Sequence, residues 1–474
     1  MRMTWPQRMA LAVYGWLMQA LVPLMLARLR RRGRDEPLYL QHVGQRLGRY
    51  ASSPQHADWF WVHAVSLGET RAAALLIEQL RAARPGIRIL LTHGTATGWA
   101  QGQPLLQPGD AQAWLPWDTP GATRRFLEHF RPLVGVLLET EVWPHLVHQC
   151  ARRSIPLCLV NARMNERSMR RARRLAWLAG PAYAALAAIH AQSSQDARRL
   201  KLVGARVDGV WGNLKFDVAP DDQQRAVARR WRDAMASHGP LVMLASSREG
   251  EEQLWLQAWL ALRERAPHVR WLIVPRHPQR FDPVYRLLAD AGLAVARRVD
   301  WDDAHDAAGL GALARRARIW LGDSVGEMQL YYSLSDAALL GGSFLPLGGQ
   351  NLIEALSCGC PVIAGPYTFN FAQAADAAIR AGAAWRCADM DEAVRQVLQL
   401  LSPGEDPALP DGTALLRAAG SRHAPALDAA RGAGLRLVEE GRGAALSYAQ
   451  AVLDLAWLRA SQLPGARPAP RPLR

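Results

Sequence analysis

Residues 240–278 read PLVMLASSREGEEQLWLQAWLALRERAPHVRWLIVPRHP. An apolar run of strand length, 240–247, is followed by a segment of helical period, 248–266, and then by a second apolar run, 269–278. Two buried strands joined by a helix are typical of a βαβ unit, in which the strands are parallel. This stretch therefore predicts an α/β fold built on a parallel sheet.

Apolar runs of the same kind occur on both sides of residues 218–239, with helix-like stretches between most of them. They lie at 58–65, 87–94, 111–117, 132–139, 155–161 and 187–193 in the first series, and at 240–247, 269–278, 317–324, 336–344 and 360–366 in the second. A chain of 474 residues is too long for one compact core. We therefore predict two Rossmann-like domains, 35–217 and 240–458, with a linker at 218–239 and a disordered Pro/Arg-rich tail at 459–474.

The N-terminus carries an uncharged stretch, residues 9–27, with the sequence MALAVYGWLMQALVPLMLA. Five arginines follow it within residues 28–34, whereas two precede it. A spanning helix needs about 20 apolar residues, so we predict that residues 1–34 form a membrane anchor with a basic flank. The positive-inside rule then places the rest of the chain on the cytoplasmic side. A helix that spans the bilayer and one that lies in a single leaflet both remain open.

The chain has 57 basic and 42 acidic residues and a net charge of +15, which predicts an anionic partner. We expect a membrane surface or a phosphorylated substrate and no nucleic acid, since aromatic residues are not interleaved with the basic ones as single-strand binding requires. One predicted helix carries a cluster of arginines, which forms either a solvated face or a contact with lipid phosphates. The cluster comprises Arg163, Arg167, Arg170, Arg171, Arg173 and Arg174.

Candidate catalytic residues stand where strands or the first domain end. Glu69 lies in HAVSLGET (63–70), Glu139 in LETEVWP (138–144) and Lys215 in GNLKFD (212–217). Ligands of open α/β sheets bind at the carboxyl ends of strands. A carboxylate fixed at a helix N-terminus can act as a general base, and a lysine can neutralise a phosphate leaving group. An ordinary first-turn glutamate and a solvated lysine are the alternatives.

Two strands of the second series are each followed by a segment suited to binding phosphate. Arg276 comes directly after a strand in VPRHPQRF (274–281), and arginine binds phosphate through two N–H groups. GGSFLPLGGQNLIEALSCGCPV (341–362) reads as a glycine-rich loop and then a helix that starts near residue 350. Backbone N–H groups of such a loop can approach phosphate oxygens, although glycines also serve ordinary turns.

Nine blocks of the chain together resemble, in order and spacing, the 3-deoxy-D-manno-octulosonic acid (Kdo) transferases. They are HAVSLGET, LETEVWP, NARMNERS, GNLKFD, ASSREGEE, VPRHPQRF, GDSVGEM, GGSFLPLGGQNLIEAL and GPYTFNF. The resemblance implies a GT-B architecture, two Rossmann-like domains facing a cleft, and a membrane-associating segment. It also implies transfer of Kdo from CMP-Kdo to the lipid A precursor (lipid IVA) at the inner membrane, in lipopolysaccharide synthesis, by an inverting single displacement.

The resemblance assigns roles by position. Glu69 matches the general base, and Glu139 and Lys215 match residues that stabilise the transition state. Three segments match those that contact CMP. These segments comprise Pro275, Arg276, Val325, Gly326, Glu327, Asn351, Leu352, Ile353 and Glu354. The chain departs from the family pattern at Asn213, Arg248 and Ala355-Leu356, and Arg248 puts the details of the phosphate site in doubt.

We expect neither a metal ion nor a cofactor, CMP-Kdo being a donor substrate. None of the carboxylates that follow the predicted strands forms the D-x-D sequence of metal-dependent glycosyltransferases; Glu139-Thr-Glu141 comes nearest. Two alternatives remain. Another GT-B transferase of envelope synthesis would bind UDP in place of CMP. A basic membrane-surface binding protein would not explain why Glu69, Glu139 and Lys215 fall at strand or domain ends.

Overall fold

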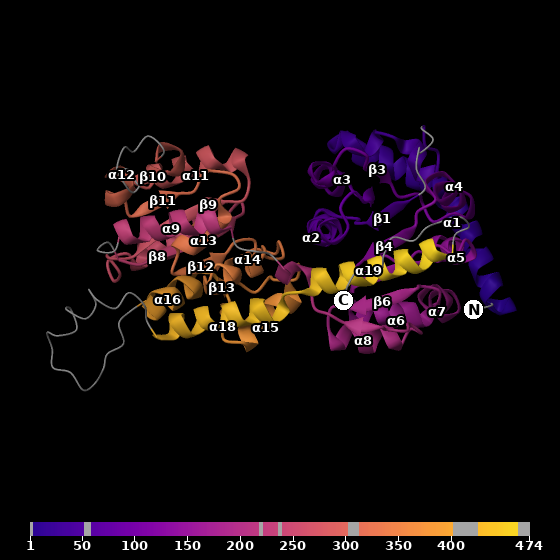
Figure 1. Cartoon of the computed structure of the whole chain (residues 1–474). Coiled ribbons are helices and arrows are strands. Elements are labelled where there is room, and N and C mark those ends of the chain that lie inside the picture. The colour runs from indigo at the N-terminus through magenta and orange to yellow at the C-terminus, as the bar shows by residue number, and fades with distance from the viewer. Residues whose placement is uncertain are drawn as a thin grey trace. The chain divides into compact units, whose positions relative to one another are not determined.

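The computed structural model describes residues 3–51, 58–217, 221–235, 239–301, 312–401 and 425–462. The chain divides into two compact units: unit 1 comprises Met1–Asp217 with Gly441–Arg474, and unit 2 comprises Val218–Glu440. Within the described residues each unit contains one seven-stranded sheet in which all neighbouring strands are parallel (Figure 1). The predicted pair of Rossmann-like α/β domains is thus confirmed.

The sheet of unit 1 has the strand order β3-β2-β1-β4-β5-β6-β7. Its strands are β1 (Trp59–His63), β2 (Arg88–His93), β3 (Ala111–Trp114), β4 (Val134–Leu138), β5 (Leu157–Ala162), β6 (Ala188–Ala191) and β7 (Gly209–Val210). Its longer helices are α1 (Trp5–Asp35), α2 (Leu67–Ala83), α3 (Ala96–Gly102), α4 (Pro120–Phe130), α5 (Pro144–Arg152), α6 (Glu166–Arg174), α7 (Ala176–Ala184), α8 (Ser194–Lys201) and α19 (Ala444–Ser461). Short 3-10 turns are η1 (Pro37–Leu40), η2 (Val43–Leu47), η3 (Gln103–Leu105) and η4 (Leu214–Asp217).

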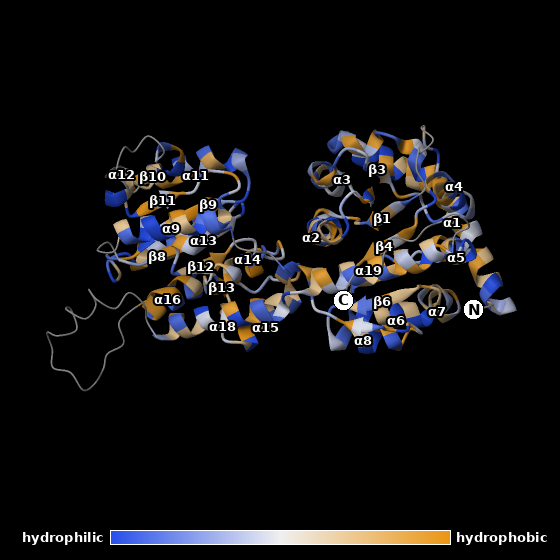
Figure 2. Ribbon diagram, viewed as in Figure 1, coloured by the Kyte–Doolittle hydropathy of each residue, from blue (hydrophilic) through white to orange (hydrophobic). Residues whose placement is uncertain are grey.

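Both faces of this sheet are covered, which explains why its strands read as continuous apolar runs. Trp61 points to one face, where it joins the core formed by residues of α4, α5 and α8. Val62 points to the other, where it joins residues of α2 and α19. The covering helices carry both hydrophobic and hydrophilic residues, as helices with one buried face do (Figure 2).

The sheet of unit 2 has the order β10-β11-β9-β8-β12-β13-β14. Its strands are β8 (Leu241–Ser247), β9 (Arg270–Pro275), β10 (Val295–Arg297), β11 (Ile319–Leu321), β12 (Ala337–Leu340), β13 (Val362–Ala364) and β14 (Ala384–Arg386). Its helices are α9 (Asp222–Ala234), α10 (Glu251–Leu262), α11 (Phe281–Asp290), α12 (Ala312–Arg316), α13 (Met328–Leu334), α14 (Leu352–Ser357), α15 (Ala372–Arg380), α16 (Met390–Leu401) and α18 (Pro425–Gly441), with 3-10 turns η5 (Pro278–Arg280) and η6 (Arg298–Asp300).

Three predicted boundaries differ from the structure. The predicted linker, 218–239, contains helix α9, which packs against α13 and belongs to unit 2. The predicted C-terminal domain, 240–458, is too long, because residues from Gly441 onward belong to unit 1. The predicted tail, 459–474, begins inside α19, and residues 463–474 lie outside the described residues.

The return of the chain to unit 1 has a local cause. Asp217, the last residue of the first segment of unit 1, accepts hydrogen bonds from the backbone N–H groups of Gly443 and Ala445. It therefore caps the N-terminus of α19. Farther along the helix the Tyr448 hydroxyl donates to the carbonyl of Gly212 at 2.7 Å. These contacts fix α19 against the sheet of unit 1.

Candidate functional site

Strands β1 and β4 are neighbours in the middle of the sheet of unit 1. After β1 the chain continues to β2 on one side, and after β4 it continues to β5 on the other. Such a topological switch point leaves a crevice at the carboxyl ends of the strands, where ligands bind in α/β folds. Glu69 follows β1, and Glu139 and Glu141 follow β4. The fold therefore brings the predicted carboxylates to the same place.

Glu69 is held by the start of helix α2. Its backbone N–H donates to the Ser66 hydroxyl, and its carboxylate accepts the N–H of Val65 at 2.8 Å and the Ser66 hydroxyl at 3.2 Å. This reciprocal capping satisfies donors that the first helical turn leaves free. Burial raises the pKa of Glu69 to about 7; the Val65 hydrogen bond opposes that rise, and the charges of Glu139 and Glu141 add to it. The side chain is thus immobile and titrates near neutral pH.

Glu139 is buried and has a backbone φ of 57°, in the left-handed region that non-glycine residues rarely adopt. Its carboxylate lies 3.7 Å from the Lys215 ammonium and 3.3 Å from the Nε atom of Arg163. Strained residues of this kind persist where the surrounding structure determines them, and they cluster at functional sites. Glu139 and Lys215, both of which the resemblance matches to residues that stabilise the transition state, form an ion pair.

The position of Lys215 follows from η4, which packs against α2, the helix that carries Glu69. The backbone N–H of Lys215 donates to the side chain of Asn213 at 3.0 Å, and that of Leu214 donates to Asn161. Asn213, one of the departures from the family pattern, thus supplies an acceptor that holds the lysine segment.

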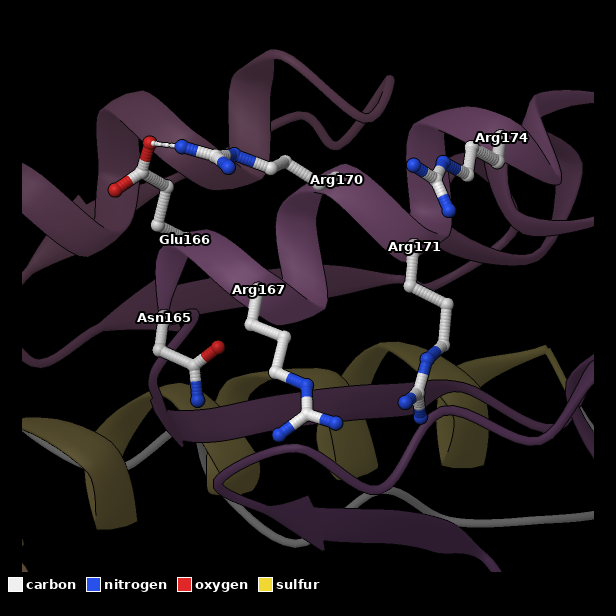
Figure 3. A pocket seen from close by; sticks show the side chains of 6 residues that line it. All are labelled: Asn165, Glu166, Arg167, Arg170, Arg171 and Arg174. Carbon is white, nitrogen blue, oxygen red and sulfur yellow. Dashed lines mark hydrogen bonds and ion pairs between the residues drawn. The ribbon is translucent and has the colours of Figure 1, made fainter.

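The arginine cluster needs one correction. Arg163 is not on the predicted helix: it follows β5 and pairs with Glu139, whereas α6 begins at Glu166. A cavity of about 650 Å³ borders α6 and is lined, among described residues, by Asn165, Glu166, Arg167, Arg170, Arg171 and Arg174. Figure 3 shows Arg167 and Arg171 extending to the same side of the helix, while Arg170 reaches Glu166.

Unit 2 has its own switch point, between β8 and β12. The buried carboxylate of Glu251 accepts three backbone N–H groups there: those of Arg248, Gly342 and Phe344, at 2.9, 2.7 and 3.1 Å. Gly341 packs so closely on β8 that a Cβ atom would lie 2.4 Å from the carbonyl oxygen of Ser246. The glycine-rich loop is therefore fastened to the loop after β8.

Positive charge gathers beside this loop. Arg248, Arg276 and Arg280 all act on His277, whose pKa is lowered first by burial and then by these three charges. Burial and the three neighbouring charges thus both favour the neutral form of His277. Arg248, the departure that left the phosphate site in doubt, contributes to the same cationic surface as Arg276.

The remaining predicted donor residues are of three kinds. Val325 is exposed beside Gly326, whose φ is 90°, while Glu327 forms an ion pair with Arg298 at 2.7 Å and accepts the Ser324 hydroxyl. Asn351 caps α14 through the N–H of Ile353. The side chains of Leu352 and Ile353 are buried in the core, so they offer a ligand only their backbone.

Glu354 and Arg276 lie close enough to Tyr332 to act on the pKa of its hydroxyl, which burial raises and Glu354 raises further. Pro275 ends β9 directly before Arg276. Arg276, after β9, and Glu354, in α14, thus both act on Tyr332.

Three roles in these sites were not predicted from the sequence: Arg163 as the partner of Glu139, Glu251 as the acceptor for the glycine-rich loop, and Asp217 as the cap of α19. Arg163 and Glu251 lie within the quoted blocks, yet nothing in a linear pattern indicates that a carboxylate will meet three N–H groups of a distant loop. Two D-x-D sequences also occur away from the predicted strand ends, at 300–302 and 389–391. Asp389 accepts the N–H of Glu392 at the start of α16, and Asp302 lies outside the described residues.

The chain matches a protein-family model and is similar in sequence to individual proteins along most of its length. The family model of 3-deoxy-D-manno-octulosonic-acid transferase (kdotransferase) matches residues 41–218. The 3-deoxy-D-manno-octulosonic acid transferase of Bordetella pertussis is 44% identical over 406 residues, covering 83% of this chain and 92% of that protein. The enzyme of the same name from Haemophilus influenzae is 32% identical over 362 residues, covering 76% and 82%.

Among solved structures, the C-terminal CMP-Kdo binding domain of WaaA from Acinetobacter baumannii is 24% identical, covers 46% of this chain and 100% of that chain, and has a TM-score of 0.37. The sequence identities, unlike this structural similarity, extend over most of both chains. The protein therefore belongs to the 3-deoxy-D-manno-octulosonic acid (Kdo) transferases, a family of glycosyltransferases.

Proposed function

We propose that this enzyme transfers Kdo from CMP-Kdo to the lipid A precursor, lipid IVA, in lipopolysaccharide synthesis, by an inverting single displacement with Glu69 as the general base. The observation that carries the mechanism is the cluster at the switch point of unit 1. Glu69 titrates near pH 7 beside Glu139, which contacts Lys215. Family membership supports the choice of donor and acceptor.

The chemistry follows from this arrangement. Glu69 takes the proton of an acceptor hydroxyl as that oxygen attacks the anomeric carbon of Kdo. The bond from that carbon to the phosphate oxygen breaks, and CMP leaves with the electron pair. Lys215 offsets the negative charge that develops, and Glu139 holds Lys215 in place. A base with a pKa near the working pH is the most effective, because it is ionised and still basic enough to accept the proton.

Unit 2 supplies the donor site in this proposal. Arg276 and Arg248 bind the phosphate of CMP, and the backbone around Gly326 and Asn351 contacts the nucleoside. Glu251 accepts hydrogen bonds from Gly342 and Phe344 of the glycine-rich loop and thereby holds that loop in one conformation, so that less entropy is lost when the donor binds.

We also propose that the reaction needs no metal ion, since Lys215, Arg276 and Arg248 provide the cations that would otherwise have to come from one. Transfer should be unchanged after dialysis against EDTA and should not increase when Mg²⁺ or Mn²⁺ is restored. Loss of turnover in chelator that a divalent ion reverses would refute the metal-free mechanism.

Attachment to the cytoplasmic face of the inner membrane completes the proposal. Among the described helices, α1 is the one long and apolar enough to cross a bilayer. The arginines that follow its apolar residues suit an anionic leaflet, to which each basic residue near the surface contributes about 1 kcal/mol. The arginines of α6 suit the same leaflet or the phosphates of the acceptor.

The test compares three proteins in the transfer of Kdo from CMP-Kdo, generated in situ, to tetra-acylated lipid A precursor. Glu69→Gln keeps an oxygen that can accept the Val65 N–H, so that the cap survives while the base is lost. Glu78→Gln, at an exposed position of the same helix, is the matched control. We expect Glu69→Gln to lose about 10²–10⁴ in kcat, with its melting temperature and the activity of the control unchanged.

The other outcomes are informative as well. Full activity of a folded Glu69→Gln protein would keep the reaction and refute Glu69 as its base. No transfer by the parent protein, with UDP but not CMP raising its melting temperature, would instead indicate a transferase that uses a UDP-sugar.

A further inference from the structure

The uncharged segment of helix α1, residues 9–27, is largely apolar around the helix but is covered by protein on only one side. Its buried and half-buried residues recur every three or four positions from one end of the helix to the other. They are Gln7, Ala10, Leu11, Tyr14, Gly15, Met18, Val22, Met25, Leu26, Leu29 and Gly33. This spacing describes a single helical face, and the elements that α1 contacts, α5, α7 and η1, all belong to unit 1.

The middle of this face is fixed by specific contacts. The Tyr14 ring stacks on His145, with ring centroids 5.6 Å apart, and Tyr14 and the buried carboxylate of Asp118 are near enough for each to shift the pKa of the other. That carboxylate also accepts the N–H groups of His145 and Leu146 at 3.0 and 2.8 Å, in the first turn of α5. A Cβ atom on Gly15 would lie 2.5 Å from the His145 ring and 3.0 Å from Pro120, so the helix backbone approaches the domain as closely as glycine permits.

The C-terminal part is fixed in the same way. A Cβ atom on Gly33 would lie 2.3 Å from the Leu40 side chain, and the Arg32 guanidinium lies 5.3 Å from the centre of the Tyr39 ring. Contacts with the domain therefore reach from the apolar segment to the basic flank.

These contacts oppose a spanning position for the docked helix. A span would put residues 9–27 across the hydrocarbon. Since Leu11, Tyr14 and Gly15 are packed on the domain, the polar residues Asp118 and His145 would have to enter the hydrocarbon with them. Placing a buried, hydrogen-bonded carboxylate and the first turn of α5 in hydrocarbon is strongly unfavourable.

The opposite face of α1 is exposed and apolar. Its large residues are Trp5, Met9, Val13, Trp16, Leu17, Leu21 and Leu24, of which Trp16 is 82% exposed and Trp5 74%. Trp177, on α7 beside α1, is 68% exposed. Tryptophan is the residue that favours the boundary between lipid and water. The arginines that follow, Arg28, Arg30, Arg31 and Arg34, are exposed as well.

We propose that α1 lies in the plane of one leaflet of an anionic bilayer, with one face on unit 1 and the other in lipid, and does not cross the membrane. Helices of this kind insert their apolar face to about 5–10 Å. Because the arginines lie at the end of the same docked helix, they meet the phosphates of that leaflet. This inference rests on the membrane attachment proposed above but not on the reaction.

The decisive test measures depth at two exposed positions of α1. A single nitroxide label is placed at Met9→Cys in one protein and at Leu24→Cys in another, each full-length and in anionic vesicles. The two positions are about 22 Å apart along the helix axis. Lipid-soluble oxygen and a water-soluble nickel chelate then report the depth of each label, with Glu264→Cys on the surface of unit 2 as the aqueous reference. An in-plane helix gives the two labels the same shallow depth within a few Å.

Two results would overturn the inference. Labels in opposite leaflets would mean that α1 spans the bilayer, and labels reached by neither oxygen nor the chelate would mean that a second copy of the chain covers this face. Kdo transfer by the same labelled proteins separates the two proposals: activity together with opposite leaflets refutes only the in-plane helix, whereas an inactive parent protein with equal depths refutes only the proposed reaction.

A substitution pair tests the docking itself. Gly15→Leu should lower the melting temperature of the detergent-solubilised protein, since its side chain collides with His145 and Pro120. Ala12→Leu, on the exposed side of the same helix, should leave the melting temperature unchanged. Equal melting temperatures would show that α1 is not docked and would remove the basis of the inference.

Discussion

A single side chain, Glu69, serves both the folding of unit 1 and the proposed chemistry. Its carboxylate closes the N-terminus of α2 and, because that terminus lies at the end of β1, faces the crevice between β1 and β4. A base held by two short local hydrogen bonds loses no conformational freedom when substrate arrives. The same hydrogen bonds lower its pKa, while burial and the neighbouring carboxylates raise the pKa to about 7.

This balance predicts the pH dependence of the reaction. Glu69 must be ionised to act, and the ionised fraction increases as the pH rises through its pKa of about 7. The value of kcat/KM for Kdo transfer should therefore increase about tenfold per pH unit below 7 and level off above it. A plateau that extends unchanged down to pH 5 would show that a group with an ordinary carboxyl pKa, or no group at all, limits the rate.

For single residues, the sequence predicted where the candidate catalytic side chains lie better than it predicted which side chains they contact. Glu69, Glu139 and Lys215 could be found because each directly follows a strand or ends the first domain. The ion pair between Glu139 and Arg163 could not, since it depends on the left-handed backbone of Glu139 and on the path of the loop after β5. Glu139 is not glycine, so nothing in the sequence marks that conformation.

At the scale of elements, the loops of unit 2 depend on one carboxylate. Glu251 joins the start of α10 to the loop after β12, and its side chain is fully buried. An unpaired buried N–H group costs about 1–3 kcal/mol. Glu251 is therefore a positioning residue for the glycine-rich loop, which is the loop proposed to bind the donor.

Glu251→Ala should lower the stability of the protein by a few kcal/mol and raise the KM for CMP-Kdo more than it lowers kcat. Glu249→Ala is the control: Glu249 lies two residues away and its side chain is 88% exposed. This substitution should change neither the stability nor the KM for CMP-Kdo. The measurements are thermal unfolding and steady-state transfer at varied CMP-Kdo. A donor KM equal to that of the parent would mean that the loop keeps its conformation without Glu251.

The predicted strands were all confirmed, because each is a run of apolar residues long enough to recognise and covered on both sides. The sequence missed three edge strands: β7 of unit 1, which has two residues, and β10 and β14 of unit 2, which have three residues each. Arg297 and Arg386 stand within the latter two. Such short edge strands leave no periodic pattern.

At the scale of the whole molecule, the chain passes from unit 1 to unit 2 and returns. The sequence did not predict that return, since α19 follows α18 almost without a break and its apolar residues suit either sheet. What decides between them is tertiary packing. Seven residues of α19, all of them buried, belong to the core on the α2 face of unit 1: Ala444, Ala445, Tyr448, Ala449, Val452, Leu453 and Ala456.

This packing makes the N-terminal domain dependent on the end of the chain. A fragment of residues 1–217 in detergent should unfold at a lower temperature than unit 1 does in the full-length protein, because removing α19 uncovers part of one face of its sheet. Each large apolar side chain that loses its cover, Val62 and Leu76 among them, costs about 1.5–3 kcal/mol. Adding residues 441–462 through a flexible linker should restore the melting temperature, whereas the same peptide with Tyr448→Asp and Val452→Asp should not. If the bare fragment were as stable as unit 1 in the whole protein, α19 would contribute nothing to its core, and the boundary predicted from the sequence would serve as well as the one in the structure.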